Sequence, residues 1–244
     1  MKYSLFILFS LIISLSSMGQ TDETVNTKED FKEMSKMSSM NSRNTGYQSL
    51  QSLSNTVTKG SQFFNPSWSK GSVTSLDGST VTNNYFFMYD KVRQELFIKE
   101  KGSEQILQGE KNQITGFTLN TDKVHSFAPA HIYDKENNND FFEVLVKNDA
   151  GITLLKKIST KYFPVDKSDI MKVKSGDFSD EYRDDIKYYI SIKKGVPEEF
   201  KLREKSIKKV LPETKQIALS QYFKENSGEI NDNYLIDLFQ TLNK

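Results

Sequence analysis

The chain has 244 residues, with 33 lysine plus arginine against 32 aspartate plus glutamate, 36% hydrophobic residues and no cysteine. The lack of cysteine excludes a disulfide scaffold, a thiolate zinc site, a cysteine nucleophile and a lipidated cysteine anchor. A formal charge of +1 is too small for a typical nucleic-acid binder, which needs a positive excess to neutralise phosphates. We therefore expect no nucleic-acid partner.

Residues 1–19 have the features of a secretory signal peptide. Lys2 supplies the positive charge, residues 5–15 (LFILFSLIISL) form the apolar segment, and Ser17-Met18-Gly19 puts small residues at the cleavage positions. The apolar segment is shorter than the ~20 residues of a membrane-spanning helix, so an uncleaved anchor is the less favoured alternative. Cleavage removes one lysine and no acid, which leaves 32 charges of each sign. We expect Sec export to the periplasm or the outside of the cell, with no transmembrane segment in the mature chain.

Two regions of different character follow the signal peptide. Residues 20–62 are rich in polar residues and poor in apolar ones, which predicts a flexible polar arm. In residues 63–195, short β-prone runs alternate with turn signals, a pattern typical of an antiparallel meander. Asp77-Gly78 is a strong hairpin signal, and Pro129 predicts an edge or a bend within the run 124–133.

The spacing of apolar residues changes from a strand period to a helix period between the end of the β region and the C-terminus. Residues 152–162 and 186–192 are predicted as long strands, with residues 164–185 connecting them. Residues 196–244 form C-terminal helices packed on the body, with Asn231 or Asp232 as the cap of the last one. The predicted apolar side chains of these helices are Ile217, Ala218, Tyr222, Phe223, Leu235, Leu238, Phe239 and Leu242. The sequence thus predicts an α+β, β-rich fold: an antiparallel meander, as a sandwich or an open barrel-like sheet, with a small C-terminal helical segment.

An ordered series of short motifs runs from Tyr47 to Asn243. The motifs are Gly60-Ser61-Gln62-Phe63-Phe64 with Trp68 and Gly71, Phe87-Met88-Tyr89-Asp90 with Glu95-Leu96, Gly116-Phe117-Thr118-Leu119, Phe142-Glu143-Val144-Leu145, Gly151 with Leu154-Leu155-Lys156-Lys157, Tyr188-Tyr189-Ile190 and a helical tail ending near Leu242-Asn243. Through their order and spacing the chain resembles a family of uncharacterised exported proteins of Bacteroidetes-type Gram-negative bacteria. The resemblance implies export and an undefined role, and it supplies no catalytic residues.

The two histidines are candidate metal ligands. His125 and His131 precede the carboxylates Asp134, Asp140 and Glu143, and two histidines with a carboxylate are a real zinc set. Six residues of extended strand separate the histidines by about 20 Å, so only a sharp bend at Pro129 could unite them. We expect ordinary surface histidines, no metal site and no cofactor.

One acidic group could serve calcium binding or glycoside hydrolysis. It comprises Asp177, Asp180, Glu181, Asp184 and Asp185. Its spacing lacks the pattern and the glycine of an EF-hand, and Arg183 lies within it, so a solvated charged loop is the favoured interpretation. Paired carboxylates of this kind suit glycoside hydrolysis in principle, but no substrate platform accompanies them. No Gly-x-Ser-x-Gly elbow or phosphate loop is present, and we name no catalytic residue.

Aromatic residues make up 12% of the chain and are the only residue class in which the composition is enriched. Exposed aromatic rings stack on sugars or anchor protein partners, whereas buried rings form the core of a sheet. We expect most of them to be buried, and we choose Trp68, Tyr85 and Tyr89 as the best candidates for a binding surface.

These observations favour an exported envelope protein that acts as a non-enzymatic protein-interaction module, associated with the outer membrane only through a partner. The partner is expected to be another envelope or surface protein. The alternative is an exported hydrolase of glycans or envelope polymers, for which Glu143, Asp180 and Asp184 would have to converge in a pocket. A third possibility is a structural component of a surface assembly that pairs through its strand edges.

Overall fold

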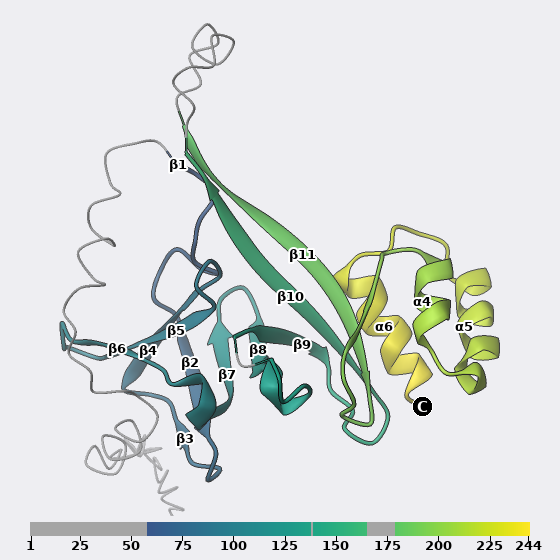
Figure 1. Ribbon diagram of the computed structural model, residues 1–244, viewed down its shortest axis with the longest axis horizontal. Coiled ribbons are helices and arrows are strands. Elements are labelled where there is room, and N and C mark those ends of the chain that lie inside the picture. Colours follow the sequence, from purple (N-terminus) through teal and green to yellow (C-terminus); the bar gives the residue numbers. More distant parts are fainter. Residues whose placement is uncertain (1–57, 138, 165–178) are drawn as a thin grey trace, which may run out of the picture.

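The computed structural model describes residues 58–137, 139–164 and 179–244. The predicted signal peptide and most of the predicted arm lie outside these residues. The described chain is α+β and β-rich, with two β-sheets and three α-helices at its C-terminal end, as predicted (Figure 1). Neither sheet closes into a barrel within the described residues.

The larger sheet contains nine strands. Their bounds are β1 Thr58–Lys59, β2 Lys70–Ser75, β3 Thr80–Val81, β7 Ile114–Asn120, β8 Val124–Pro129, β9 Phe141–Val146, β10 Ile152–Phe163, β11 Asp180–Ile192 and β12 Glu198–Phe200. The order is β1-β11-β10-β9-β8-β7-β2-β3, with β12 also beside β11. Every pair is antiparallel except β1 with β11, so β7 to β11 form the predicted meander.

The smaller sheet contains β4 (Tyr85–Asp90), β5 (Glu95–Glu100) and β6 (Ile106–Gln108) in that order. The chain leaves the larger sheet after β3, builds this three-stranded layer, and returns as β7 beside β2. The layer packs on one face of β2, β7, β8 and β9 in a core with Phe87, Leu96, Phe117 and Phe141 at its centre. Figure 1 shows β4 to β6 at one end of the molecule.

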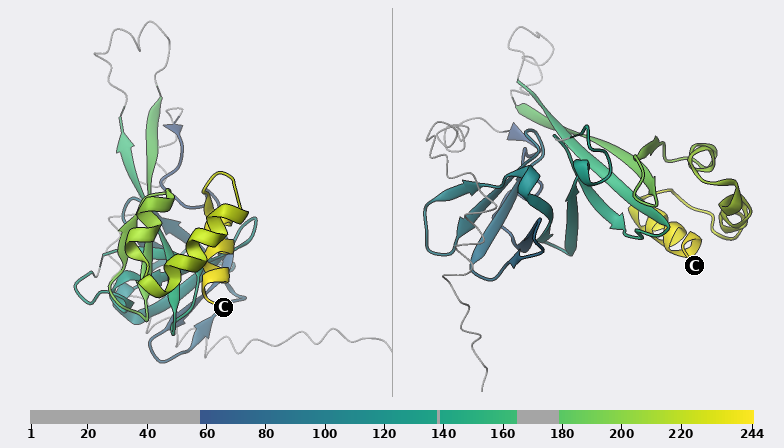
Figure 2. Two further views of the ribbon diagram at one scale, coloured as in Figure 1. Left: turned by 90° about the vertical axis from the view of Figure 1, so that its right-hand side faces the viewer. Right: turned by 60° about the horizontal axis from the view of Figure 1, so that its bottom comes forward.

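The three helices cover the other end of the same face. They are α4 (Glu204–Val210), α5 (Glu213–Glu225) and α6 (Asp232–Leu242). The predicted stripe of α6 is fully buried against Leu154 of β10 and Ile190 of β11, and the Asn231 side chain caps α6 by accepting a hydrogen bond from the Tyr234 amide. One twisted sheet therefore carries two separate cores on one face, the β4–β6 core and the helical core (Figure 2).

The two turns predicted from local sequence motifs are confirmed. Ser75 and Ser79 close the hairpin over Asp77-Gly78, with Gly78 at a φ of 87°. β8 ends at Pro129, and the 3-10 turn η2 (Ala130–Ile132) bends the chain away. Two of the four residues predicted for the apolar side of α5 are wrong: Ile217, at 83% exposure, and Ala218 are exposed, whereas Leu219 and Tyr222 are the buried residues of that helix.

Two boundaries differ from the sequence prediction. The last long strand begins at Asp180 instead of 186, so Asp180, Asp184 and Asp185 stand on β11 and not in a loop, whereas Asp177 lies outside the described residues. The helices do not follow directly on residue 195, because β12 first pairs with β11. The first residues of β11 and the strand β12 are stabilised mainly by pairing with strands that are distant in the sequence. The local sequence pattern does not reveal such pairing.

Residues 58–62 belong to the folded part and not to a flexible arm. Thr58 and Lys59 pair in parallel with Asp180 and Glu181 on β11. Gly60, at a φ of 76°, then turns the chain so closely over Tyr182 that a Cβ at this position would overlap with the Tyr182 carbonyl oxygen. The Gln62 carbonyl accepts the Lys91 amide, which ties this segment to the end of β4.

None of the helices within residues 58–137, 139–164 and 179–244 has the length and apolar character that a bilayer crossing requires.

Candidate functional site

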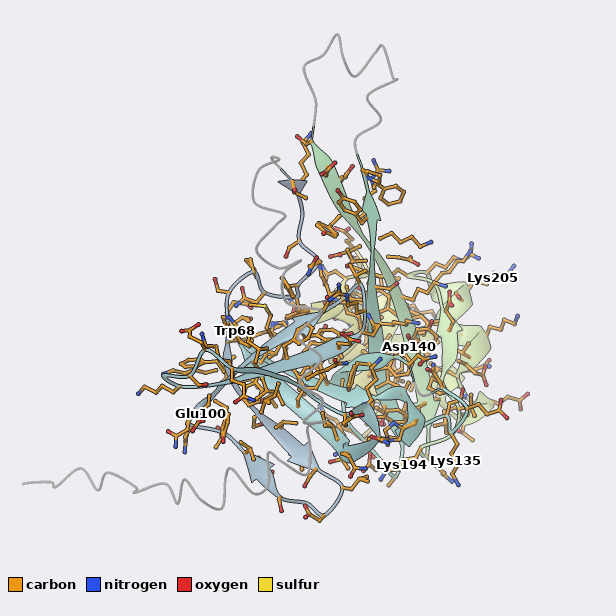
Figure 3. The ribbon with its side chains drawn as sticks, turned by 60° about the vertical axis from the view of Figure 1, so that its left-hand side comes forward. Trp68, Glu100, Lys135, Asp140, Lys194 and Lys205 are labelled. Atoms are coloured by element: carbon orange, nitrogen blue, oxygen red, sulfur yellow. The ribbon has the colours of Figure 1, made fainter. Side chains whose placement is uncertain are left out.

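The three aromatic residues predicted to bind do not form a surface. Tyr85 and Tyr89 are 3% and 1% exposed, so their predicted exposure is wrong. They alternate with Phe86 along β4, and the face that they share with Phe87 is the one that covers the larger sheet. Trp68 is half-buried and lies on the far side of the body from the helices (Figure 3).

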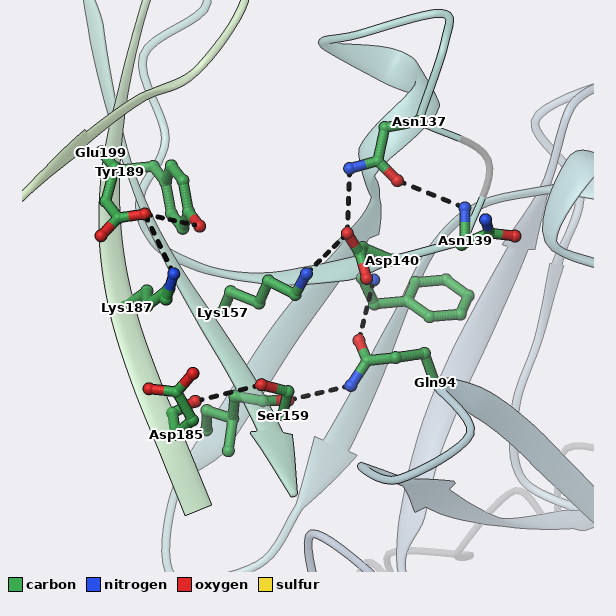
Figure 4. A network of polar contacts seen from close by, with 12 residues as sticks. Gln94, Asn137, Asn139, Asp140, Lys157, Ser159, Asp185, Lys187, Tyr189 and Glu199 are labelled. Carbon is green, nitrogen blue, oxygen red and sulfur yellow. Dashed lines mark hydrogen bonds and ion pairs between the residues drawn. The ribbon is translucent and has the colours of Figure 1, made fainter. Parts of the chain in front are cut away.

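Tyr89 is held by one buried side chain that sequence reasoning missed, Gln94. The Tyr89 hydroxyl donates to Gln94 Oε1 at 2.7 Å, and burial raises the pKa of this phenol well above its usual value. Gln94 Oε1 also accepts the Phe141 amide, while its Nε2 donates to the carbonyls of Lys91 and Ile158. Gln94 thus joins β4, β9 and β10, and Figure 4 shows it beside the ion pair of Asp140 and Lys157.

The two histidines are not the ordinary surface residues that were predicted, since the His125 side chain is only 11% exposed. His131 lies in η2, where it is half-buried, and His125 lies on β8 with its ring nitrogens on two carboxylates. No group of three or more metal-ligating side chains occurs among the described residues. His125 instead begins a row of polar groups that crosses the larger sheet.

This row, which we call the polar seam, contains Asp122, His125, Glu143, Lys156, Asp232 and Tyr188. It begins where Asp122 Oδ1 and Glu143 Oε1 lie 3.2 and 2.6 Å from the two ring nitrogens of His125. Lys156 Nζ lies 3.7 Å from Glu143 Oε2 and 2.6 Å from Asp232 Oδ2. The Tyr188 hydroxyl donates to Asp232 Oδ1 at 2.7 Å.

Strand register explains why these groups meet. Glu143 on β9 is directly opposite Lys156 on β10, and Lys156 is directly opposite Tyr188 on β11. All three point to the face that carries both cores, and Asp232 reaches them as the first residue of α6. The polar seam therefore lies between the β4–β6 core and the helical core.

Basic and acidic side chains alternate along the polar seam. Both ring nitrogens of His125 lie within hydrogen-bond distance of carboxylate oxygens. Burial raises the pKa of Asp232, but the hydrogen bonds from Lys156 and Tyr188 outweigh it, so the pKa is lowered overall. Burial and the same carboxylate raise the pKa of Tyr188. The Lys156 ammonium thus lies between the carboxylates of Glu143 and Asp232, although Glu143 Oε2 itself is buried without a hydrogen-bond partner among the described residues.

The lowered pKa of Asp232 predicts a loss of stability in acid. A carboxyl group with a depressed pKa stabilises the fold fully above its unfolded value of about 3.9, and this contribution disappears as the pH falls through the folded-state value. We expect Asp232→Asn to be destabilised relative to the unmodified chain near neutral pH, with the difference shrinking below about pH 4. Urea unfolding at several pH values measures this difference. Asp149→Asn, at an ion pair that is half-exposed on both sides, should show little difference at any pH, and an equal effect there would contradict the assignment.

The carboxylates required for hydrolysis are not brought together. Asp184 accepts hydrogen bonds from Lys91 and Thr160, four residues along β11 from Tyr188, a displacement of about 13 Å from the polar seam along the strand. Asp180 lies a further four residues away, where β11 begins. Glu143 is engaged by His125 and Lys156.

A different carboxyl group, Asp90, closes the turn between β4 and β5. Its Oδ1 accepts the amides of Val92 and Arg93, and its Oδ2 is buried without a hydrogen-bond partner among the described residues. Glu95 stands opposite Asp90 in the strand pair, and burial raises the pKa of Glu95. The amide contacts give Asp90 a structural role in the turn.

A group of exposed aromatic side chains lies at the end of β10 and the start of β11. Figure 2 shows that this pair of strands extends beyond the rest of the described fold. We call this group the ribbon end; it comprises Tyr162, Phe163, Tyr182, Arg183 and Ile186. The rings of Tyr162 and Tyr182 face each other across the strands with centroids 5.1 Å apart, and the Arg183 guanidinium lies 4.7 Å from the centroid of Phe163. Tyr162, Phe163 and Ile186 are 40%, 40% and 46% exposed.

One face of the ribbon end carries three apolar side chains, and the other carries a single one, Phe163, among charged side chains. The register puts Tyr162, Tyr182 and Ile186 on one face and Phe163 with Arg183 on the other. The outer edge of β11 also pairs with β1 only at 180–181 and with β12 only at 188–190, which leaves residues 182–187 without a neighbouring strand in the described chain. A strand edge and exposed rings at one place are features of a protein-binding surface.

Comparisons with known proteins identify no relative of this chain. No family model, no curated protein and no solved structure matches the chain. The resemblance to uncharacterised exported proteins therefore stays a prediction.

Proposed function

We propose that the chain is an exported envelope protein that acts without catalysis, by binding another protein of the envelope or cell surface. The ribbon end carries this proposal. Tyrosine, phenylalanine and arginine are the residue types enriched at the centres of protein interfaces, and here they stand on a ribbon that extends beyond the two cores. Export rests on the signal-peptide features of residues 1–19.

The ribbon end suits a protein partner better than a small ligand. Its apolar side chains occupy both faces of a two-stranded ribbon, where a partner chain can cover them together with the edge of β11 at 183–187, beside which the described chain places no strand. Addition of an extended segment at such an edge supplies main-chain hydrogen bonds, and the aromatic side chains supply specificity. The proposal therefore also accommodates a surface assembly built through strand edges.

Nothing specific in the described residues favours the hydrolase alternative. Glu143 and Asp184 each contact a lysine, and they lie at separate positions along the sheet. Acid catalysis would need a carboxyl group and a second carboxylate around one pocket.

The test is recovery of partners from the native envelope with two matched variants of the tagged full chain. Phe163→Ser/Ile186→Ser removes two apolar side chains from the ribbon end, and Leu76→Ser/Ile217→Ser removes two that are 58% and 83% exposed elsewhere. We expect mass spectrometry to find a reproducible partner with the unmodified chain and with the second variant, and at least a tenfold loss with the first, since hot-spot side chains contribute 2 kcal/mol or more. Equal recovery with both variants would contradict the assignment to the ribbon end.

A further inference from the structure

A cavity of about 640 Å³ lies between β12 and α4, on the helical side of the molecule. Its walls come from one short stretch of chain, residues 198–210, which runs from β12 through a tight connection into α4. Phe200, at 3% exposure, and Val210 supply its apolar wall, and both belong to the helical core. The cavity thus rests on a packed part of the fold.

Four cations surround this cavity: Lys201, Arg203, Lys205 and Lys209. No carboxylate pairs with any of the four within the part of the chain that the structure describes. Two glutamates also line the cavity, but Glu199 is already bound by Lys187 at 3.3 Å and by the Tyr189 hydroxyl. The cavity therefore has an excess of positive charge (Figure 4 shows the Glu199 contacts and Figure 3 the position of Lys205).

The donors in the cavity match a phosphate group. An arginine presents a planar fork of N–H donors, lysines provide mobile point charges, and Ser206 adds a hydroxyl whose oxygen accepts the Lys201 amide and whose proton can be donated. The volume of the cavity exceeds that of a single inorganic ion and falls within the range of small-molecule sites. Four cations against one unpaired glutamate, Glu198, favour a ligand with more than one negative charge.

We propose that this cavity binds a ligand that carries two or more phosphate charges, either a free phosphorylated compound or the headgroup of an anionic lipid. The site is separate from the ribbon end, so it is independent of the proposed protein contact. Where the ligand is a lipid headgroup, the cavity gives the protein a second point of attachment.

Calorimetric titration of the full chain with sodium pyrophosphate at low ionic strength tests the proposal, together with cosedimentation on phosphatidylcholine vesicles with and without phosphatidylglycerol. Arg203→Gln/Lys209→Gln removes two charges from the cavity. Lys208→Gln/Lys224→Gln removes two charges from the neighbouring hollow on α4 and α5 and serves as the control. Thermal unfolding of each variant verifies that these exposed substitutions leave the fold intact.

We expect pyrophosphate or the anionic vesicles to bind the unmodified chain and the control, and to bind the cavity variant at least about tenfold more weakly, because charge-assisted hydrogen bonds are lost. Binding of pyrophosphate would assign a free phosphorylated compound, and binding of the anionic vesicles alone would assign a lipid headgroup. Equal weakening in both variants would show attraction by net charge only and would overturn the proposal. Lack of binding to both probes would overturn it as well.

Discussion

Replacement of Lys156 by methionine is expected to lower the free energy of unfolding by about 3 kcal/mol, because removal of one partner leaves buried charges uncompensated. The Lys156 side chain is 12% exposed and lies between Glu143, at 4%, and Asp232, at 27%. Methionine keeps nearly the volume of the side chain and removes the charge together with the hydrogen bond to Asp232. Urea unfolding at neutral pH measures the change.

Two further variants make this prediction specific. Lys187→Met removes a lysine whose ion pair with Glu199 is 42% and 44% exposed, and it should change stability by less than about 1 kcal/mol. Glu143→Gln combined with Lys156→Met should be less destabilised than the sum of the two single variants, because the paired charges disappear together. Additive effects of the two substitutions would show that the polar seam is not a coupled unit.

Gln94→Leu is expected to cost about 3 kcal/mol, since the substitution removes the Gln94 contacts of the buried Phe141 amide and Tyr89 hydroxyl and takes one donor from the carbonyls of Lys91 and Ile158. Gln94 is 7% exposed, so water cannot replace these contacts at low cost. Gln105→Leu, at an exposed position before β6, is the matched control and should be nearly neutral. Equal stability of the two variants in thermal unfolding would contradict the role of Gln94 as the junction of three strands.

Local patterns predicted the elements better than their partners. Asp77-Gly78 marked a hairpin and residues 152–162 marked β10, because turn chemistry and alternation are set by neighbouring residues. The parallel pairing of Thr58 with Asp180 and the pairing of β12 with β11 join segments that no short motif connects. Their strands are short and gain their stability from the sheet that they join.

The choice of exposed face shows a second limit. Alternation along β4 correctly put Tyr85, Phe87 and Tyr89 on one face, but alternation does not reveal which face another layer covers. The β4–β6 layer packs with that face against the larger sheet, so the rings predicted to bind became its core. The exposed rings belong instead to β10 and β11, where those strands extend beyond both cores.

The polar seam could have been anticipated only in part. Glu143 stands inside an otherwise apolar strand, and Lys156 interrupts another, which are signals that a buried charge needs a partner. Their partners are far away in the sequence: Asp232 follows Lys156 by 76 residues, and its place depends on how α6 packs. Register across β9, β10 and β11 brings them together, and a single sequence does not specify that register.

The most direct test of the proposed function is site-specific crosslinking in the native host. A photo-reactive amino acid replaces Phe163 in the full chain, and in a second strain it replaces Ile217, an apolar position on α5 that is more exposed than Phe163. The account predicts one discrete adduct with an envelope protein at Phe163 and none at Ile217. An absence of adducts at Phe163, or the same adducts at both positions, would contradict the assignment of the ribbon end as the binding surface.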